Sequence, residues 1–391
     1  MREARHGHAG GDVEVLPVVD RAGLKQFIEL PFALYADDPA WVPPLRAERR
    51  MHLSPRHNPF FEHGEGQLFL ARRAGRVVGR ISAQVNRLYH AQHPDEPRTG
   101  FFGFLEGEDN PAVFRALLDA AAGWLRARGM ERMQGPFSWS INQESGLLVA
   151  GFDTPPAMMM NHARPWYDAH VQAAGLRKAM DLLAYDYRPE MGVPEKVWQF
   201  IARLQEKGEL QVRPLNRRRL REELDLIMDI FNDAWADNWG FIPFTPEDIN
   251  HMAQQLRFFI RDHDVAIASW KGEPAAMAVV MPDLNRLIAD FDGRLLPFNW
   301  ARLLWRLKVS RAPKRWRMPL MGVRRKFHGH ATAGILAMAV LEAVHAVHRQ
   351  EGYAGAELSW VLESNVRTRR IIEDTGAVPY KTYRIYERTI D

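Results

Sequence analysis

Hydrophobic and polar positions follow the same order of elements in the two halves of the chain. Residues 66–86 and 265–285 each alternate over two strands joined by a tight turn that contains glycine. A helical pattern follows in each half, over 111–128 and 332–350, and a glycine comes soon after its end. Each half then adds a strand, a short helix, a glycine and a strand that alternates toward tyrosines. This repeat predicts two similar α/β halves, each a mixed sheet flanked by helices.

The repeat divides the chain into two domains with a connection between them. Residues 13–187 are predicted to form the N-terminal domain and 213–391 the C-terminal domain. Residues 188–212 are predicted to be a linker that contains one helix, over 195–206. Residues 1–12 carry no apolar pattern, so we expect a disordered N-terminus there.

The composition is that of a folded protein, since 46% of the 391 residues are hydrophobic and 26% are charged. The absence of cysteine excludes disulfides, a cysteine nucleophile and thiolate metal sites. The 15 histidines are scattered along the chain, so we expect no metal centre. The formal net charge is only +4, and the N-terminus lacks the apolar segment of a secretory signal. These features favour a cytoplasmic protein.

The sharpest local signal is the stretch LMGVRRKFHGHATAG, in which an apolar strand runs into a basic turn and then a helix. Backbone N–H groups at a helix start are unpaired, and the helix dipole adds partial positive charge there. Phosphate and pyrophosphate bind readily at such a place. The residues predicted to bind such a group are Val323, Arg324, Arg325, Lys326, Gly329, His330, Ala331 and Thr332. An ordinary turn that happens to be basic is the alternative.

This turn resembles the acyl-CoA-binding turn of the GNAT acyltransferases, whose pattern is Gln/Arg-x-x-Gly-x-Gly/Ala. Lys326, Gly329 and Ala331 take those places. The spacing from Asn365 to Gly376 also matches the family, which adds Asn365 to the predicted cofactor site. In particular, the chain resembles bacterial tandem-GNAT proteins of about this length. The resemblance implies a tandem duplicated GNAT-like N-acyltransferase fold with a mixed α/β sheet in each half.

Two departures from the family pattern qualify this resemblance. At the equivalent place the first half reads GFLEGEDNPAVF, and its three acids would repel a pyrophosphate, so we expect a degenerate cofactor site there. In the second half Ile372 stands where many GNAT enzymes have a tyrosine that protonates the leaving thiolate. We expect Tyr383 to take that role, with Tyr380 and Tyr386 as alternatives. A thiolate that leaves unassisted is a further possibility.

The resemblance implies transfer of an acyl group from acyl-CoA, or from an acyl carrier protein thioester, to a primary amine. Some bacterial tandem-GNAT proteins resemble ceramide synthases, which implies a lipid amine such as a sphingoid base. Glu357, on a buried strand, and Glu144, in an insert at 140–160 that is typical of a binding loop, are the predicted general bases. For each of them, an ion pair with one of the many arginines is the alternative.

A basic, aromatic segment at 298–317 suggests a partner surface, because no acid occurs between 293 and 327. Such a segment suits an anionic membrane, hence peripheral attachment to the inner face, or an acidic acyl carrier protein. A helix packed on its own domain is the third reading. Two rival functions also remain: a non-catalytic acyl-CoA or lipid-binding module, and an aminoacyl-tRNA-dependent transferase. Nucleic acid is not favoured, because no recognition motif occurs.

Overall fold

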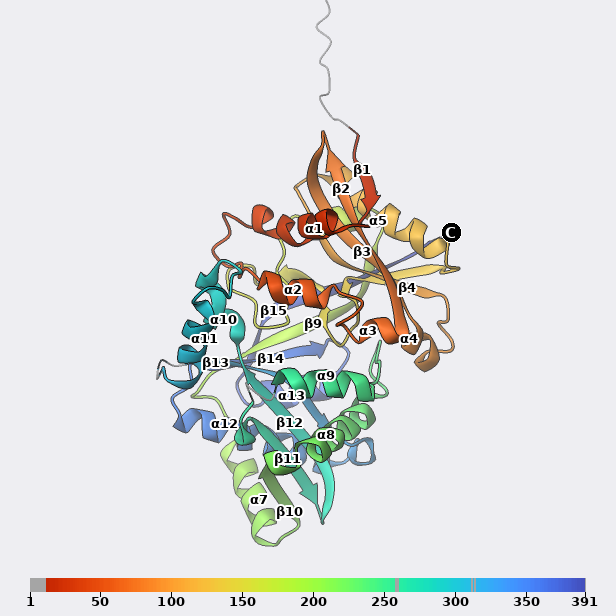
Figure 1. Cartoon of the computed structure of the whole chain (residues 1–391). Coiled ribbons are helices and arrows are strands. Elements are labelled where there is room, and N and C mark those ends of the chain that lie inside the picture. Colours follow the sequence, from red (N-terminus) through yellow and green to blue (C-terminus); the bar gives the residue numbers. More distant parts are fainter. Residues whose placement is uncertain (1–11, 257–259, 311, 313, 391) are drawn as a thin grey trace, which may run out of the picture.

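A computed structural model describes residues 12–256, 260–310, 312 and 314–390 (Figure 1). The predicted disordered N-terminus lies outside the described residues, apart from residue 12. The linker helix occupies the predicted residues, and the helices expected over 111–128 and 332–350 differ by two residues or fewer at each end. The repeated order of elements is therefore present in both halves.

The elements of the first half place α5 against a five-stranded layer. They are β1 (Glu14–Pro17), α1 (Arg21–Leu34), α2 (Arg46–His52), α3 (Phe60–His63), β2 (Gly64–Arg73), β3 (Arg76–Asn86), α4 (Arg87–Gln92), β4 (Thr99–Gly107), α5 (Pro111–Arg126), β5 (Arg132–Gly135), β6 (Phe137–Ser138), β7 (Glu144–Ser145), β8 (Leu147–Ala150), α6 (Tyr167–Ala173) and β9 (Arg177–Tyr187).

The second half repeats this plan after the linker helix. Its elements are α7 (Glu195–Glu206), β10 (Leu210–Pro214), η1 (Arg217–Arg219), α8 (Leu220–Trp235), α9 (Pro246–Leu256), η2 (Asp262–Asp264), β11 (Val265–Trp270), β12 (Glu273–Pro282), α10 (Leu284–Ile288), η3 (Ala289–Phe291), α11 (Asn299–Lys308), β13 (Arg315–Val323), η4 (Arg325–Phe327), α12 (Ala331–Gln350), β14 (Gly355–Leu362), α13 (Val366–Glu373) and β15 (Val378–Thr389).

One continuous sheet runs through both halves, in the order β1-β2-β3-β4-β5-β15-β9-β14-β13-β12-β11-β10. The last strand of each half lies beside a strand of the other half. β9 pairs with β14 of the second half, and β15 pairs with β5 and β8 of the first half. These exchanged strands cross the middle of the molecule (Figure 1). The two halves are therefore joined by backbone hydrogen bonds, in addition to the linker.

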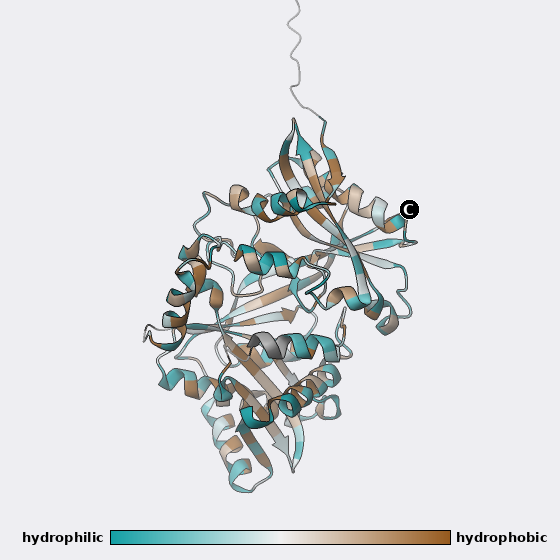
Figure 2. Ribbon diagram, viewed as in Figure 1, coloured by the Kyte–Doolittle hydropathy of each residue, from teal (hydrophilic) through white to brown (hydrophobic). Residues whose placement is uncertain are grey.

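The apolar cores follow this exchange, and the strands that carry them are the brown segments at the centre of Figure 2. Tyr383 and Tyr386 of β15 belong to the core of the first half, whereas Tyr185 and Tyr187 of β9 belong to that of the second. α12 packs on the second core. Of the described helices, α12 is long and apolar enough to cross a membrane, but more than half of that stretch is buried in the protein.

The basic insert of the second half is shorter than the sequence suggested. Only Asn299–Lys308 forms the helix α11. The prediction of an exposed surface over 298–317 is wrong at its C-terminal end. Trp316 and Arg317 lie in β13 and are 6% and 3% exposed. Arg317 is buried because its guanidinium faces Glu357 of the neighbouring strand, 3.9 Å away. The insert is therefore buried at Trp316 and Arg317, the last two residues of the predicted surface.

Candidate active site

A slot opens in the sheet where β13 and β14 separate. The two strands pair in parallel only from Arg315↔Gly355 to Met318↔Leu358. Pro319 follows, and proline has no N–H to donate to a ladder. Beyond it lies a cavity of about 720 Å³ between the two strands and the first turns of α12 and α13, which we call the slot.

The start of α12 opens into this slot without a side-chain cap. His330, in extended conformation, occupies the N-cap position and its side chain accepts no backbone hydrogen bond. Gly329 lies at φ +86°, a backbone conformation that favours glycine, and it lines the slot. The Ala333 N–H donates to the His330 carbonyl at 3.1 Å, and the side chain of His330 does not cap the N–H groups of Ala331 and Thr332 before it, so these can meet a ligand.

The equivalent place in the first half is closed by the chain's own side chains. Asn110 caps α5, because its side-chain oxygen accepts from the Ala112 N–H at 2.9 Å. The buried Glu106 carboxylate accepts from the Tyr35 and Tyr167 hydroxyls at 2.5 and 2.8 Å. A largely buried carboxylate and a side-chain cap therefore occupy this place. The degenerate cofactor site expected for this half stays a prediction.

The slot gathers some of the predicted cofactor residues and not others. Val323, Gly329, His330, Ala331 and Asn365 line it, and so does Ile372. Thr332 is the second residue of α12, outside the residues that line the slot.

The three predicted cations of the turn are already matched by acids. Arg324 pairs with Asp229, Arg325 with Asp233 and Asp237, and Lys326 with Glu273. In their place the slot holds Arg367 and Arg370, which are exposed side chains of α13. The sequence pattern missed this pair because it directed attention to the turn before α12.

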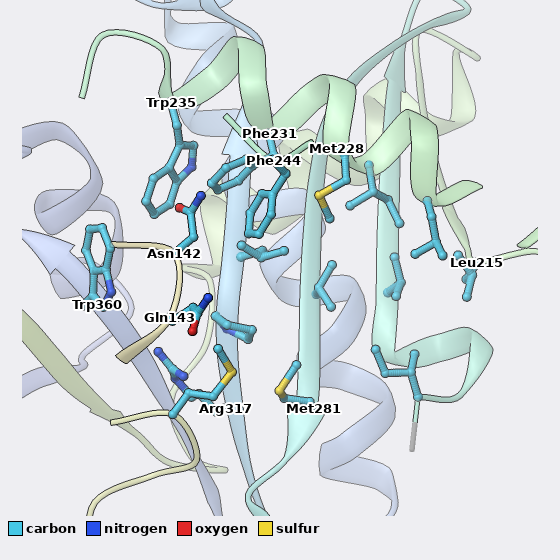
Figure 3. Close-up of a pocket in the computed structure, with 18 of the residues that line it drawn as sticks. Asn142, Gln143, Leu215, Met228, Phe231, Trp235, Phe244, Met281, Arg317 and Trp360 are labelled. Atoms are coloured by element: carbon cyan, nitrogen blue, oxygen red, sulfur yellow. The ribbon is translucent and has the colours of Figure 1, made fainter. Parts of the chain in front are cut away.

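A second, apolar cavity of about 340 Å³ lies between α8 and the strands β11 to β13 (Figure 3). One stripe of α8, at helical spacing, lines it with Leu220, Leu224, Ile227, Met228, Phe231 and Trp235. The slot and this apolar cavity share Trp235, Pro319 and Trp360, so they meet there. The two indole rings stand edge to face with centroids 5.5 Å apart. A group entering through the slot can therefore continue into apolar space.

The insert of the first half covers this cavity. Asn142, Gln143 and Met159 line its wall. The Asn142 amide donates to the Ile242 carbonyl at 2.9 Å, and Gln143 hydrogen-bonds His52 at 2.6 Å. Figure 3 shows both amides facing the cavity beside Trp360 and Arg317. The first half thus supplies one wall of the site in the second half.

Glu144, a predicted base, lies behind this wall and lines neither cavity. Its carboxylate pairs with Arg49 at 2.7 Å. Burial acts to raise the pKa of the Glu144 carboxyl, but the Arg49 guanidinium outweighs it and holds the pKa below its usual value. The contact corresponds to the ion-pair alternative, and it anchors the loop that carries Asn142 and Gln143.

Arg317 lies in the wall of the apolar cavity, beside the point where β13 and β14 separate. Its Nε donates to the Ser359 hydroxyl at 3.0 Å and its Nη1 to the Met158 carbonyl at 2.6 Å. Glu357, 1% exposed, accepts hydrogen bonds from the hydroxyls of Ser359 and Tyr380. Ser359 also lines the slot, so it connects Glu357 to the slot.

The predicted acid Tyr383 is buried in the core, and its hydroxyl has no hydrogen-bond partner among the described residues. Burial, followed by the nearby Glu357 carboxylate, raises the pKa of Tyr383 well above its usual value. Tyr386 instead donates to Asp168 at 2.5 Å. Of the three tyrosines considered from sequence, Tyr380 is the one that contacts Glu357.

Asp283, at the end of β12, is a further buried carboxyl near this cluster. Its Oδ1 accepts from the Met158 N–H at 2.9 Å. Burial, then repulsion from Glu357, raises the pKa of Asp283 to about 6. The folded protein therefore binds this proton more tightly than the unfolded chain, so the stabilising protonated form is lost as pH rises through about 4 to 6.

Replacement of Asp283 by asparagine is expected to stabilise the protein above that window. The amide oxygen keeps the Met158 contact, and the cost of a buried charge disappears, by up to ~3 kcal/mol at about pH 8. Urea unfolding at about pH 8 and about pH 4 measures the difference, which should shrink at the lower pH. Asp292→Asn, at an exposed position, serves as the control. An unchanged or lower stability of Asp283→Asn at the higher pH would contradict the assignment.

Within the described part of the chain, no three His, Asp or Glu side chains gather as a metal site would require. The candidate site combines a helix start without a side-chain cap, an apolar cavity and a buried Arg–Glu–Ser–Tyr cluster.

Comparisons of the sequence with known proteins identify relatives of this chain. No family profile matches the chain. The bacterial ceramide synthase of Caulobacter vibrioides is 44% identical over 380 residues, which cover 97% of this chain and 98% of that protein. Protein YghO of Escherichia coli K12 is 41% identical over 373 residues, covering 95% and 94%.

Solved structures agree on the fold. A tandem GNAT protein from the clavulanic acid biosynthesis pathway superposes with a TM-score of 0.54 at 15% identity, covering 97% of this chain and 99% of that one. A GCN5-related N-acetyltransferase from Sphaerobacter thermophilus gives 0.51 at 13% identity, covering 97% and 96%. The duplicated GNAT-like fold predicted from the sequence is thus confirmed. The chain is an acyltransferase, and it belongs to the tandem-GNAT family that includes the bacterial ceramide synthase.

Proposed function

We propose that this protein transfers a long-chain acyl group from acyl-CoA to the primary amine of a long-chain lipid base, as in ceramide formation. The observation that carries the proposal is the apolar cavity that meets the slot at Trp235, Pro319 and Trp360. An acetyl group would not need such a space, whereas a hydrocarbon chain gains free energy from every methylene that it buries. The Caulobacter relative, by its name, makes ceramide.

The slot supports the binding of the donor. The pyrophosphate would lie against the open N–H groups of the first turn of α12, with Arg367 and Arg370 nearby. The pantetheine arm would run between β13 and β14, where the strands no longer pair with each other. The thioester carbonyl would then reach the junction, and the acyl chain would enter the apolar cavity.

At the junction the amine nitrogen attacks the thioester carbon, the C–N bond forms, and the C–S bond then breaks. Arg317 lies at the end of the strand ladder, where its guanidinium would stabilise the developing oxyanion. Glu357 would take the proton of the attacking amine through Ser359, which donates to it. The thiolate leaves as such, because a thiol pKa near about 8.5 makes it a fair leaving group.

The test is thiol release by the purified full chain, with acetyl-CoA and palmitoyl-CoA as donors and a sphingoid base or a short soluble amine as acceptors. We expect a kcat/KM at least about 100-fold higher for the long donor with the long-chain amine, since a buried methylene contributes about 0.8 kcal/mol. A palmitoyl acyl carrier protein is compared in the same assay. Equal rates with acetyl-CoA, or turnover with short donors alone, would contradict the lipid assignment.

A further inference from the structure

The helix α11 presents a large apolar face to solvent. Its outward face consists of Trp300, Ala301, Leu304, Trp305 and Lys308, which are all exposed. On the opposite side, Arg302 and Arg306 both pair with Asp290 at 2.6 Å. An amphipathic helix on a protein surface normally turns its apolar side toward the core. Leu303 of α11 does pack inward, so the exposed apolar face is additional to the packed one and suits an apolar environment outside the protein.

The residues around α11 extend the same surface. Leu296, Phe298 and Val309 are 73%, 76% and 64% exposed, and Trp300, Leu304 and Trp305 are 48%, 50% and 57% exposed. Scattered apolar residues on a surface are ordinary, but a contiguous group of this size marks an interaction site. We call this group, with Arg294 and Lys308, the α11 surface.

The charge at this surface selects the partner. No acid occurs between residues 293 and 327. Lys308 is exposed on the α11 surface, and so is Arg294, which lies 3.8 Å from the exposed Asp292. The nearby Asp290 is occupied by Arg302 and Arg306. Tryptophans beside basic side chains suit the headgroup region of an anionic bilayer, where indoles lie at the interface and cations attract the lipid charge.

The α11 surface is rigidly connected to the wall of the apolar cavity. Phe291 and Leu303 pack with Val42 of the first half. Just before α10, Asp283 accepts from the Met158 N–H, and Asn285 donates to the carbonyls of Pro156 and Ala157 at 3.1 Å each. Met159, next in the chain, is 37% exposed and lines the apolar cavity. Through α10 and residues 156–159, a bilayer against α11 would thus be connected to one wall of the apolar cavity.

We propose that the α11 surface docks the protein on an anionic membrane. This docking is separate from the acyl transfer, and it would place the mouth of the apolar cavity beside lipids of that membrane.

The experiment is sedimentation of the purified full chain with vesicles of phosphatidylcholine, with and without phosphatidylglycerol. We expect binding to the anionic vesicles. The variant Leu304→Ser/Trp305→Ser should reduce that binding about tenfold or more, and Lys308→Glu about fivefold or more. The matched controls are Trp198→Ser/Phe200→Ser and Lys207→Glu on the exposed side of α7, which should bind as the unmodified chain does. Circular dichroism and turnover of a soluble amine check that each variant is folded.

The proposal would be overturned by equal binding to vesicles with and without phosphatidylglycerol. Vesicle binding that the Leu304→Ser/Trp305→Ser variant leaves unchanged would overturn it too. A third contrary result is that the chain binds no vesicles but binds an acidic acyl carrier protein, and that Leu304→Ser/Trp305→Ser abolishes this binding. The α11 surface would then dock a protein. Sedimentation requires no turnover, so the result stands whether or not the proposed acyl transfer is found.

Discussion

Replacing Leu224 with tryptophan is expected to shift the protein toward shorter acyl donors. Leu224 lies in the middle of the α8 stripe, and an indole there would fill part of the apolar cavity of about 340 Å³. A long chain could then no longer extend along α8, so kcat/KM for palmitoyl-CoA should fall about 100-fold or more, while a short acyl donor keeps its rate. Leu220→Trp, at the opposite end of α8 from Trp235, should exclude only the longest chains.

The measurement is kcat/KM over a series of acyl-CoA donors of increasing length, with one amine. Asp225→Trp is the matched control, because Asp225 is exposed on the same helix and contacts only Arg221 among the described residues. Urea unfolding shows whether a low kcat/KM reflects an unfolded variant or the exclusion of long acyl chains from the cavity. If a folded Leu224→Trp variant lowers kcat/KM equally for donors of every length, the acyl chain does not occupy this cavity.

Removing the Arg317 side chain is expected to destabilise the protein strongly. Arg317→Met would leave the Glu357 carboxylate buried without its cation, at a cost of about 3–5 kcal/mol. The double variant Arg317→Met/Glu357→Gln removes both charges, so it should be less destabilised than the sum of the single variants. Urea unfolding of the four proteins gives the coupling energy. Additive effects would show that the two side chains do not interact across the strands.

The same variants separate catalysis from stability. We expect Glu357→Gln to lower kcat by about 10²- to 10⁴-fold, because an amide cannot take the proton of the amine. Tyr380→Phe removes a hydroxyl that donates to Glu357 and leaves the carboxylate, so it should lower kcat less than Glu357→Gln does. A Glu357→Gln protein that is folded and keeps its full rate would exclude Glu357 as the base.

Local sequence patterns predicted the positions of helices and strands well, but not which strands pair with each other. Alternation, glycines and helix caps marked the linker helix and the two long helices within a few residues. The exchange of β9 and β15 could not be predicted, because both strands carry the same tyrosine alternation and neither pattern states which neighbour it will pair with. Strand pairing is a property of the whole sheet.

The site shows the same limit at the level of side chains. The helix start at α12 was apparent because its residues are contiguous in the sequence, and its part in cofactor binding stays a prediction. The acids that neutralise Arg324 and Arg325 lie about ninety residues earlier, on α8 and just after it, where no local pattern connects them. Arg317 and Glu357 are neighbours only because of the register between β13 and β14. The sequence alone therefore could not predict the Arg–Glu–Ser–Tyr cluster.

The exchanged strands also set an order of events during synthesis. β15 ends at Thr389, close to the end of the chain, yet Tyr383 and Tyr386 complete the core of the first half. While the ribosome is still translating the second half, the edge of β5 has no neighbour and the first core is open to water. The core of the first half therefore cannot be completed before β15 has been translated, so a nascent chain reaches its native structure only after that strand has left the ribosome.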